Sequence, residues 1–389
     1  MSVLIVPMRI AIVSLTQKGL SGGGRKYIQH IVPLMQEDPQ VSALKLFLPR
    51  RVMETQNLGL SGLEAWPESD PLLGHRRLKA GLREFTPDVV FIPTARWLNC
   101  GNVPTVVMVR NMEALAMPFF GNPVSERIRN LVLAYLAKTA CRRASRIIAV
   151  SNFVSDFLTR EWSLNPGKIG IVYHGVEPPP QKDLLSIPSV IERIDGRPFI
   201  FTAGSIRPYR AYEDVIRALA ILRNGAHDYC LVIAGAVHRR MSFYKGKLNE
   251  LAVELNIGSR IVWAGNLSPE EMSWSFYNCA TFVMTSKVEA CPNIALEAMS
   301  HGCQIVSTIQ PPMPEFFAHS ALYYQPEDPD DLARKIIQVV NATPMQREIW
   351  RSTALSRADH FNWANTARLT IQELKMAISA SNVQRLGIN

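Results

Sequence analysis

Short apolar runs alternate with amphipathic stretches along almost all of the 389 residues, and no other feature constrains the fold as much. The apolar runs have the length of strands, and the stretches between them have the period of helices. Strands that alternate with helices predict parallel sheets covered by helices. The chain is therefore expected to be an α/β protein, and its length favours two domains over one.

The alternation occurs twice. In the first half, the expected strands are 9–15, 44–48, 89–92, 105–109, 146–150 and 169–172. The expected helices there are 25–35, 75–85, 124–141 and 152–161. The pattern stops at Glu177 and the three prolines after it, which form a stiff connection. It then restarts with strands at 199–203, 230–234, 260–264, 280–284 and 305–306. The helices expected between and after them are 213–222, 244–255, 269–277 and, from 329 onward, a helical end whose last helix is 364–379.

Composition is that of a globular protein in a reducing compartment. No apolar run reaches the roughly 20 residues that span a bilayer. The first fifteen residues lack the basic start of a signal peptide, and both Met1 and Met8 are candidates for the native start. The six cysteines show no Cys-x-x-Cys pair and no zinc spacing, which favours reduced thiols and a cytoplasmic location.

Positive charge is concentrated in the first half. Residues 1–180 hold 21 Lys and Arg against 13 Asp and Glu, whereas the remainder holds 21 against 20. A basic face attracts membrane surfaces, phosphorylated acceptors or nucleic acid. Nucleic-acid motifs are absent, so we favour an anionic membrane surface, at the inner face of the membrane, as the partner of this basic half. The alternative is a domain that is basic without any such partner. The basic, leucine-rich segment 126–146 fits an interfacial helix and a core helix with a basic outer face equally well.

Two glutamates eight positions apart, Glu289 and Glu297, flank the start of an expected helix. Pro292 suits the first helical position, because its missing N–H would be unpaired there. The N–H groups of Asn293 and Ile294 would then be free at the positive end of the helix, which suits a phosphate. A sugar nucleotide has the matching layout of sugar, diphosphate and ribose. The alternative is an ordinary amphipathic helix with two surface glutamates.

The sequence Glu-Ala-Cys-Pro-Asn-Ile-Ala-Leu-Glu-Ala-Met at 289–299 resembles the Glu-x7-Glu signature of family 4 retaining glycosyltransferases, in the variant of a bacterial surface-polysaccharide subgroup. The resemblance implies the GT-B fold, in which two Rossmann-like doubly wound domains face a cleft. It implies an acceptor-side domain at 1–178 and a nucleotide-sugar donor domain at 179–363. The final helix, about 364–389, would pack back on the first domain.

The loop after the first strand of the second half carries two cations. In the family this loop reads Gly-Arg-x4-Lys-Gly, and its cations bind the diphosphate and offset charge on the leaving nucleotide. Here Gly204 and Arg210 match, but Ser205 stands at the arginine position, so Arg207 is expected to supply the second cation. Arginine adds a fork that fits phosphate. A solvated helix entrance is the alternative.

The glycine-rich stretch 19–27 follows the first strand but lacks the Gly-x-Gly-x-x-Gly spacing of nicotinamide enzymes. The resemblance implies that Gly23 and Gly24 form a loop against the donor's phosphate or the acceptor, while a flexible turn is the alternative. At the end of the strand 105–109, relatives carry a His-Asp pair, where this chain has Arg110 and Asn111. Arginine is no general base at neutral pH. The family mechanism instead gives the acceptor's proton to a β-phosphate oxygen.

Three further positions receive roles by the resemblance. His174 lies at the hinge between the two halves, where a hinge or hydrogen-bonding role is expected rather than a catalytic one. Gly265 and Asn266 follow a strand where relatives hold the nucleobase through the backbone. The acidic run 328–331 precedes a helix and is expected to cap it, so no metal site is expected.

Together, the residues and the resemblance predict a metal-independent hexosyltransferase that moves a sugar from a nucleotide-diphosphate donor to a saccharide or lipid-linked acceptor in polysaccharide biosynthesis. Glu289, Arg210 and Arg110 are its expected catalytic residues. The expected donor-binding residues are Gly204, Ser205, Arg207, Gly265, Asn266, Ala290, Cys291, Asn293, Ile294 and Glu297. Gly23, Gly24 and Asn111 are expected at the acceptor or a phosphate, and no cofactor is expected. The rivals are a GT-B sugar-nucleotide epimerase and a non-catalytic sugar-nucleotide binding protein.

Overall fold

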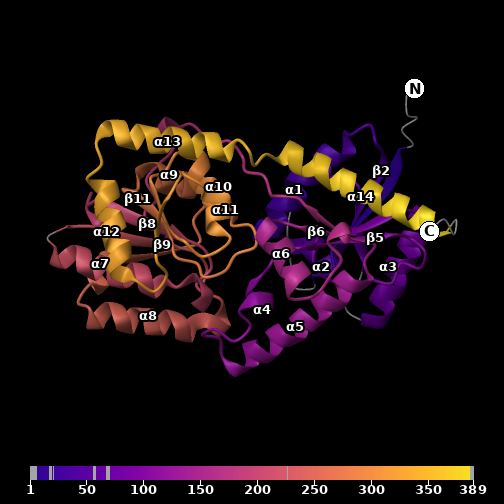
Figure 1. Ribbon diagram of the computed structural model, residues 1–389, viewed down its shortest axis with the longest axis horizontal. Helices are drawn as coiled ribbons and strands as arrows, with labels where there is room; N and C mark the ends of the chain where they lie inside the picture. The colour runs from indigo at the N-terminus through magenta and orange to yellow at the C-terminus, as the bar shows by residue number, and fades with distance from the viewer. Residues whose placement is uncertain are drawn as a thin grey trace. The chain divides into compact units, whose positions relative to one another are not determined.

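The computed structural model describes residues 7–16, 20, 22–55, 58–66, 71–225 and 227–385. The chain forms two compact units. Unit 1 comprises Met1–Leu115, Ile128–Gly175 and Trp363–Asn389, and unit 2 comprises Ala116–Arg127 and Val176–Asn362. Each unit has its own parallel sheet with helices packed against it (Figure 1). Within the described residues, no helix is long and apolar enough to cross a membrane.

The sheet of unit 1 has seven parallel strands in the order β3-β2-β1-β4-β5-β6-β7. They are β1 Met8–Val13, β2 Val41–Pro49, β3 Leu63–Trp66, β4 Val89–Ile92, β5 Thr105–Val109, β6 Arg146–Ala149 and β7 Ile169–Ile171. The central strands are buried on both faces, as parallel strands between helices must be. The sequence prediction missed β3, because this edge strand has four residues and is only partly buried.

Helices cover this sheet and connect its strands. They are α1 Gly22–Gln36, α2 Arg50–Thr55, α3 Pro71–Phe85, α4 Glu113–Ala116, α5 Val124–Arg143, α6 Asn152–Arg160 and α14 Trp363–Arg385. The last helix, α14, packs on α1 and on β4, β5 and β6, and Figure 1 shows it in yellow beside α1. The end of the chain is therefore part of the first sheet's helical cover.

A nearly buried ion pair fixes α14 to the sheet. Arg146 Nε at the start of β6 lies 2.6 Å from Glu373 Oε2, and both side chains are about nine-tenths buried. Arg146 Nη1 also donates to the Gly167 carbonyl at 3.0 Å. Gly170 in β7 leaves the room that Glu373 needs, since a Cβ there would lie 2.1 Å from the carboxyl carbon. Removing one partner would leave the other charge buried without compensation.

Glu373→Ala is expected to lower the free energy of unfolding by up to about 3 kcal/mol, because it strands Arg146 in a nearly buried position. Chemical denaturation of the full chain measures the loss. Gln372→Ala changes the exposed neighbour on the same helix and is expected to stay within about 0.5 kcal/mol of the wild type. Equal stabilities of the two variants would contradict an anchoring role for the pair.

The sheet of unit 2 has six parallel strands in the order β10-β9-β8-β11-β12-β13. They are β8 Phe199–Ala203, β9 Cys230–Ala234, β10 Ile261–Gly265, β11 Thr281–Met284, β12 Ile305–Thr308 and β13 Leu322–Tyr324. Its helices are α7 Tyr212–Asn224, α8 Ser242–Glu254, α9 Pro269–Asn278, α10 Asn293–Ser300, α11 Met313–Phe317, α12 Pro329–Val340 and α13 Pro344–Ala358. The strands expected at 199–203 and 230–234 are confirmed with the same bounds, as are 89–92 and 105–109 in unit 1.

The two faces of this sheet have different cores, because successive side chains of a strand point to opposite faces. Ile200 and Val283 point into a cluster with the apolar sides of α7, α8 and α12. Phe201 and Phe282 point the other way and meet Phe276 of α9, with ring centroids 5.3 and 5.6 Å from that ring. Both faces of the sheet are therefore covered by apolar side chains of the helices.

Candidate functional site at the carboxyl ends of the strands

The order of strands in unit 2 places a topological switch point between β8 and β11. The chain leaves β8 for β9 on one side, and leaves β11 for β12 on the other. In open α/β sheets, ligands bind in the crevice that forms outside the carboxyl ends of strands at such a point. The loop after β8 holds the expected cations, and the loop after β11 holds Glu289.

The structure brings Arg210 and Glu289 together at this switch point. Arg210 Nη1 lies 2.7 Å from Glu289 Oε1, and both side chains are nearly nine-tenths buried. The same guanidinium nitrogen donates to Ser286 Oγ at 3.3 Å. Thr285 Oγ1 donates to the Arg210 carbonyl at 2.5 Å, so side chain and backbone both join the two loops. The two residues were predicted for separate parts of a ligand, and here they contact each other directly.

Gly204 makes this geometry possible. Its φ is +141°, a conformation that suits glycine, and a Cβ there would lie 2.7 Å from Arg210 Cζ. Tyr212 Oη donates to the Gly204 carbonyl at 2.9 Å and fixes the turn. Gly235, at the end of β9, is equally constrained, since its Cβ would lie 1.9 Å from the Gly204 oxygen. The glycines at the ends of β8 and β9 therefore serve the protein's own packing, and Gly235 was missed by the sequence prediction.

Arg210 keeps its charge in this nearly buried position. Burial lowers the pKa of Arg210, but the Glu289 carboxylate and neighbouring Tyr209 outweigh it, so the pKa is raised. Its Nε is buried and makes no hydrogen bond with any residue in the described ranges. A buried donor in a native structure normally has a partner. Arg210 therefore retains one donor for an anionic ligand oxygen while Glu289 holds the rest of the guanidinium.

The start of α10 differs from the prediction. Pro292 is the N-cap rather than the first helical residue, because its ψ of 89° is not helical. Its carbonyl accepts from the N–H groups of Ala295 at 2.8 Å and Leu296 at 3.3 Å. The helix thus begins at Asn293, one residue later than expected. The first two N–H groups of the helix belong to Asn293 and Ile294. They come before the two N–H groups that donate to the Pro292 carbonyl.

The other residues of unit 2 that were predicted to bind the donor differ in how far they are buried. Ala290 is buried, and Cys291, Asn293, Ile294 and Glu297 are half-buried. Ser205 and Arg207 are half-buried in the loop after β8. Gly265 closes β10 with φ of +66° and Asn266 follows it, both exposed at the carboxyl edge of the sheet.

The sequence prediction also missed Lys287, in the loop between β11 and α10. Its backbone N–H donates to the Tyr209 carbonyl at 2.8 Å, which adds another tie between the two loops. Its ammonium group pairs with Glu327 and lies 4.2 Å from the Phe120 ring centroid. A lysine two residues before Glu289 was the available signal.

A second set of predicted residues meets in unit 1. Arg110 follows β5, and its guanidinium lies against the first turn of α1, where a Cβ on Gly24 would come within 2.2 Å of Nη2. Gly23 and Gly24 are helical, so the expected loop is corrected to the first turn of a helix, whereas Gly19 and Ser21 lie outside the described residues. Asn111 is exposed, and its Oδ1 accepts from the Glu113 N–H at 3.0 Å, which caps α4.

The surroundings of Arg110 favour an anion. Its Nη1 is buried and makes no hydrogen bond in the described part of the chain. Burial lowers the pKa of Arg110 to about 10, and Tyr27 opposes that shift. The first turn of α1 contains no acidic side chain and carries the positive end of the helix. Two positive elements therefore meet without a compensating carboxylate from that turn.

His174 is part of the packing beside this cluster. It is buried, and its ring centroid lies 5.2 Å from Tyr27 and 6.2 Å from Trp363. Tyr27 in turn has its hydroxyl 3.3 Å from Thr370 Oγ1 of α14. His174 is therefore part of the aromatic packing of unit 1.

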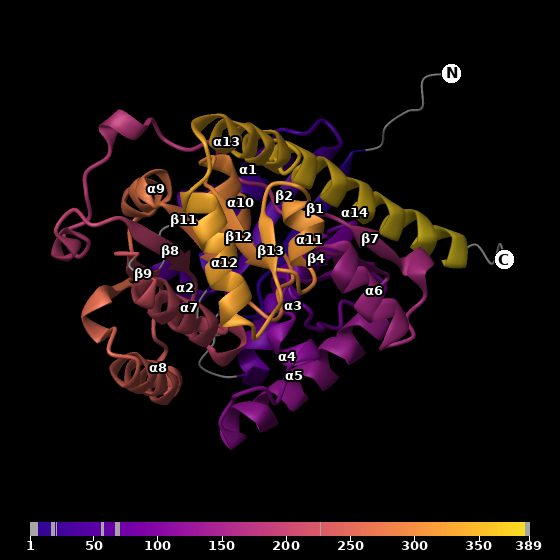
Figure 2. The same ribbon diagram turned by 60° about the vertical axis from the view of Figure 1, so that its left-hand side comes forward.

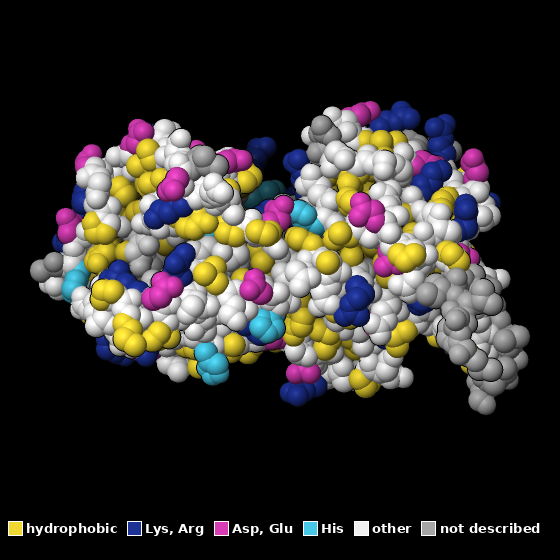
Figure 3. Space-filling view, turned by 90° about the horizontal axis from the view of Figure 1, so that it is seen from above, with side chains coloured by type: hydrophobic (Ala, Val, Ile, Leu, Met, Phe, Trp, Pro, Cys, Tyr) yellow, Lys and Arg dark blue, Asp and Glu magenta, His cyan; other side chains and the backbone are white. Residues whose placement is uncertain are grey.

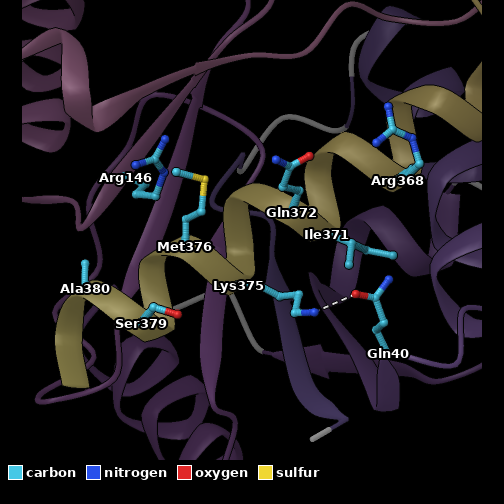
Figure 4. Close-up of a pocket in the computed structure, with 9 residues that line it drawn as sticks. All are labelled: Gln40, Arg146, Arg368, Ile371, Gln372, Lys375, Met376, Ser379 and Ala380. Carbon is cyan, nitrogen blue, oxygen red and sulfur yellow. Dashed lines mark hydrogen bonds between the residues drawn. The ribbon is translucent and has the colours of Figure 1, made fainter. Parts of the chain in front are cut away.

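A separate cavity of about 660 Å³ lies at the opposite edge of the same sheet (Figure 4). Gln40 precedes β2 and Arg146 begins β6, so the cavity is at amino ends of strands, whereas Arg110 follows a carboxyl end. Its remaining lining belongs to α14: Arg368, Ile371, Gln372, Lys375, Met376, Ser379 and Ala380. Figure 4 shows Lys375 directed to Gln40, with Nζ 2.7 Å from Oε1. It holds none of the predicted site residues.

The acidic run 328–331 caps a helix as predicted, since Asp328 Oδ1 accepts from the Asp331 N–H at 2.8 Å at the start of α12. Among the described residues, no group of three or more His, Cys, Asp or Glu side chains could hold a metal ion.

Two doubly wound parallel units, with cations and a carboxylate at the switch point of the second, define the GT-B class of fold. A solved structure of Alr3699/HepE from Anabaena, in complex with UDP and glucose, has the same fold, with a TM-score of 0.72 at 18% identity. The match covers 95% of this chain and 99% of that one.

Curated relatives are distant. An uncharacterized glycosyltransferase of Methanocaldococcus jannaschii is 21% identical over 241 residues, which is 60% of each chain. The serotype-specific mannosyltransferase WbdA of Escherichia coli is 26% identical over 185 residues, 47% of this chain and 22% of that protein. The chain thus spans less than two thirds of the length of these relatives.

Family models match both halves of the chain. The model described as Glycosyltransferase Family 4 matches residues 59–178, and the model described as Glycosyl transferases group 1 matches residues 187–355. The chain belongs to the family 4 type of glycosyltransferases, and both the resemblance and the GT-B fold class predicted from the sequence are confirmed.

Gly24→Ala is expected to lower donor turnover at least tenfold with little change in the unfolding midpoint, because the added methyl must displace the Arg110 guanidinium. Release of free nucleotide from a sugar-nucleotide donor measures turnover. Gly22→Ala is the matched control, since a Cβ there meets nothing within 4 Å. Equal rates for the two variants would show that the position of Arg110 does not matter.

Proposed function

We propose that this protein is a retaining glycosyltransferase that moves a hexose-type sugar from a nucleotide-diphosphate donor to a saccharide or lipid-linked acceptor in polysaccharide biosynthesis. The observation that carries the proposal is the Arg210–Glu289 pair at the switch point of unit 2, with α10 beginning four residues after Glu289. A cation that keeps one buried donor, a carboxylate beside it and a helix start suit a sugar diphosphate.

In this proposal the donor divides among three elements. Arg210 and Arg207, with the turn at Gly204 and Ser205 and the N–H groups of Asn293 and Ile294, hold the diphosphate. Glu289, with the loop through Ala290 and Cys291, holds the sugar hydroxyls and supports positive charge at the anomeric carbon. Glu297 binds the ribose, and Gly265 and Asn266 meet the nucleobase through the backbone.

The reaction exchanges one bond at the anomeric carbon. The bond from that carbon to the phosphate oxygen breaks, and a bond to the acceptor oxygen forms on the same face. The acceptor's proton passes to a β-phosphate oxygen. Arg110 suits this scheme because a pKa of about 10 leaves it protonated at neutral pH, so it donates hydrogen bonds and accepts no proton. Arg110 and the α1 turn at Gly23 and Gly24 would then hold a phosphate or the acceptor, with Asn111 beside them.

Donor class and acceptor class rest on similar proteins. The Anabaena structure contains UDP and glucose, and the E. coli relative is a mannosyltransferase, which supports a sugar-nucleotide donor of hexose type. We propose a cytoplasmic enzyme that meets its acceptor at the inner face of a membrane, and that neutralises the diphosphate with side chains and a helix end rather than with a metal ion.

The experiment that tests the proposal is a thermal-shift screen of UDP-, GDP-, ADP- and TDP-sugars on the full chain. A ligand that binds only the native state raises its stability by mass action. A shift with one nucleotide class, followed by sugar transfer from that donor, is the expected result. Tight binding without transfer would instead identify a sugar-nucleotide binding protein, and release of nucleotide with an isomerised sugar would identify an epimerase.

Glu289→Ala and Arg210→Ala are each expected to cut turnover at least tenfold with the fold intact, because each removes one member of the buried pair that contacts the donor. Initial rates of nucleotide release measure the effect, and circular dichroism checks the fold. Exposed side chains of the same kind serve as controls, in Glu348→Ala and Arg334→Ala, which should keep wild-type rates. Wild-type rates in both site variants would refute the assignment.

Chelation with EDTA is expected to leave turnover unchanged, because Arg210, Arg207 and the start of α10 neutralise the diphosphate. Initial rates with EDTA and with added Mg²⁺ measure this. A loss of rate on chelation that Mg²⁺ restores would contradict the metal-independent mechanism while leaving the donor-binding experiment unaffected.

A further inference from the structure

Two cysteines of unit 2 meet at the amino ends of neighbouring strands. Cys279 ends α9 just before β11, and Cys303 follows α10 just before β12. The two strands pair in parallel, with Phe282 opposite Ile305. Cys279 lies three residues before Phe282. Cys303 lies two residues before Ile305, so the strand pairing brings both cysteines to the same edge of the sheet.

The two thiols share one hydrogen-bond acceptor. Cys279 Sγ donates to the Phe276 carbonyl at 3.4 Å, and Cys303 Sγ donates to the same carbonyl at 3.2 Å. The thiols are also hydrogen-bond partners of each other. Both are free, so each sulfur lies beside the atom that it would join in a disulfide. We call Cys279 and Cys303 the unit 2 dithiol.

The two thiols differ in accessibility. Cys279 is half-buried, whereas Cys303 is only 4% exposed. Burial raises the pKa of the Cys303 thiol, and its hydrogen bond to Cys279 and the charge of a Cys279 thiolate raise that pKa further. The thiolate is the reactive form of cysteine. An incoming reagent therefore meets Cys279 first, and Cys303 stands behind it as the second, resolving thiol.

We propose that the unit 2 dithiol is an oxidation site, at which a hydroperoxide forms a reversible disulfide that slows sugar transfer. The Cys279 thiolate attacks the O–O bond of the peroxide, takes one oxygen as a sulfenic acid and releases hydroxide. The Cys303 sulfur then displaces that oxygen, which leaves as water with the Cys303 proton. One peroxide thus accepts two electrons, and two thiols become one disulfide and two waters.

The reagent and the expected compartment fit this role. The sequence favours reduced thiols, and disulfides that form in a reducing compartment are transient and redox-sensing. Hydrogen peroxide is small and uncharged, so the mixture of basic and acidic side chains that Figure 3 shows on one face neither attracts nor repels it. A thiol reductant returns the disulfide to two thiols by exchange.

The unit 2 dithiol lies at the far end of the helix that begins beside the Glu289 loop. α10 begins at Asn293, four residues after Glu289, and ends at Ser300. The chain then turns into Cys303, whose N–H donates to the Ala298 carbonyl in the last turn of the helix at 3.1 Å. Eight helical residues span about 12 Å. One short, continuous helix therefore connects the dithiol with the predicted diphosphate site.

Ring contacts join the ends of α9 and α10. The ring of His301, the C-cap of α10, has its centroid 4.9 Å from those of both Phe276 and Tyr277 in α9. Figures 1 and 2 show the two helices near each other beside β11 in both views. A disulfide of about 2.05 Å is shorter than any hydrogen bond between two sulfurs, so closing it draws the end of α10 toward α9. Dense packing transmits this strain along α10.

Peptide mapping of the full chain after treatment with hydrogen peroxide tests the disulfide. Trypsin and a protease that cleaves after glutamate place Cys279, Cys291 and Cys303 on three different peptides. The expected product joins the peptides of Cys279 and Cys303, is lighter than their sum by two hydrogen atoms, and separates in dithiothreitol. Cys279→Ser should not form it. Cys100→Ser removes a half-buried thiol of unit 1 and should form it like the wild type.

Initial rates of nucleotide release test the effect on the donor site. Peroxide is expected to slow the wild type at least threefold, and dithiothreitol is expected to restore the rate. Cys279→Ser should keep its own untreated rate, because it lacks the thiol that reacts first. Cys100→Ser should slow like the wild type. This arm rests on the proposed function, whereas the peptide mapping does not.

The proposal would be overturned by a Cys279 that peroxide converts to a sulfinic acid while Cys303 stays a free thiol. A disulfide between Cys279 and Cys291 would overturn it as well. A linked peptide without any loss of rate would show that the disulfide does not restrain α10. An equal loss of rate in Cys279→Ser would place the sensitive group elsewhere.

Failure of the oxidation site and failure of the proposed function give different results. The linked peptide is identified by its mass without any donor, so its formation does not depend on sugar transfer. A thermal shift of the reduced protein with a sugar nucleotide, but no linked peptide, would remove only the oxidation site. A linked peptide without any donor shift would support the oxidation site and count against the transferase.

Discussion

Parallel pairing of strands is the constraint on which both units depend. A parallel strand can be followed by another only after a crossover, so each strand's carboxyl end opens into a loop at the same edge of the sheet. In unit 2 this rule gathers the loops after β8 and β11 at the switch point, although 75 or more residues separate Arg210 from its partners Thr285 and Ser286. In unit 1 it brings Arg110, after β5, against the start of α1. The residues of both predicted sites therefore follow the carboxyl ends of strands, because parallel strands end at the same edge of their sheet.

The Arg210–Glu289 pair then depends on small residues that make room for it. A nearly buried ion pair is costly unless its geometry is good and its remaining groups are bonded. Gly204 leaves room for the guanidinium, which donates to Ser286 Oγ, and Thr285 donates to the Arg210 carbonyl. Tyr212 fixes the turn at Gly204. Arg210 nevertheless keeps one buried donor without a protein partner in the described ranges. A fold shaped by stability alone would give that donor a hydrogen-bond partner within the protein. The available donor therefore fits a site that binds an anion.

The basic excess of the first half acquires a location in α5. Summed over residues, that excess indicated only an attraction to anions of some kind. On the helix, Arg142 and Arg143 are exposed near exposed apolar side chains such as Leu131 and Tyr135. Arg110 is the other part of the same excess, buried and beside a helix start rather than exposed.

The sequence by itself determined the class of fold and the identity of most candidate site residues. Strand and helix periods are local, so they showed two α/β halves and even the bounds of β4, β5, β8 and β9. Short or half-exposed elements such as β3 carry too weak a period and were missed. The one-residue error at Pro292 arose because composition marks a helix start, while ψ at the proline decides it.

Only the tertiary structure decided which of those residues meet. Glu289 and Arg210 looked like ligands for different parts of a donor, and packing pairs them at 2.7 Å. Gly24 was predicted in a phosphate-binding loop. In the structure, its lack of a side chain leaves room for the Arg110 guanidinium. The outward direction of most large apolar side chains of α5 was equally hidden, because period alone does not say which face of a helix meets the sheet. Contacts between distant segments and the choice of a buried face depend on the whole fold, which local sequence patterns do not encode.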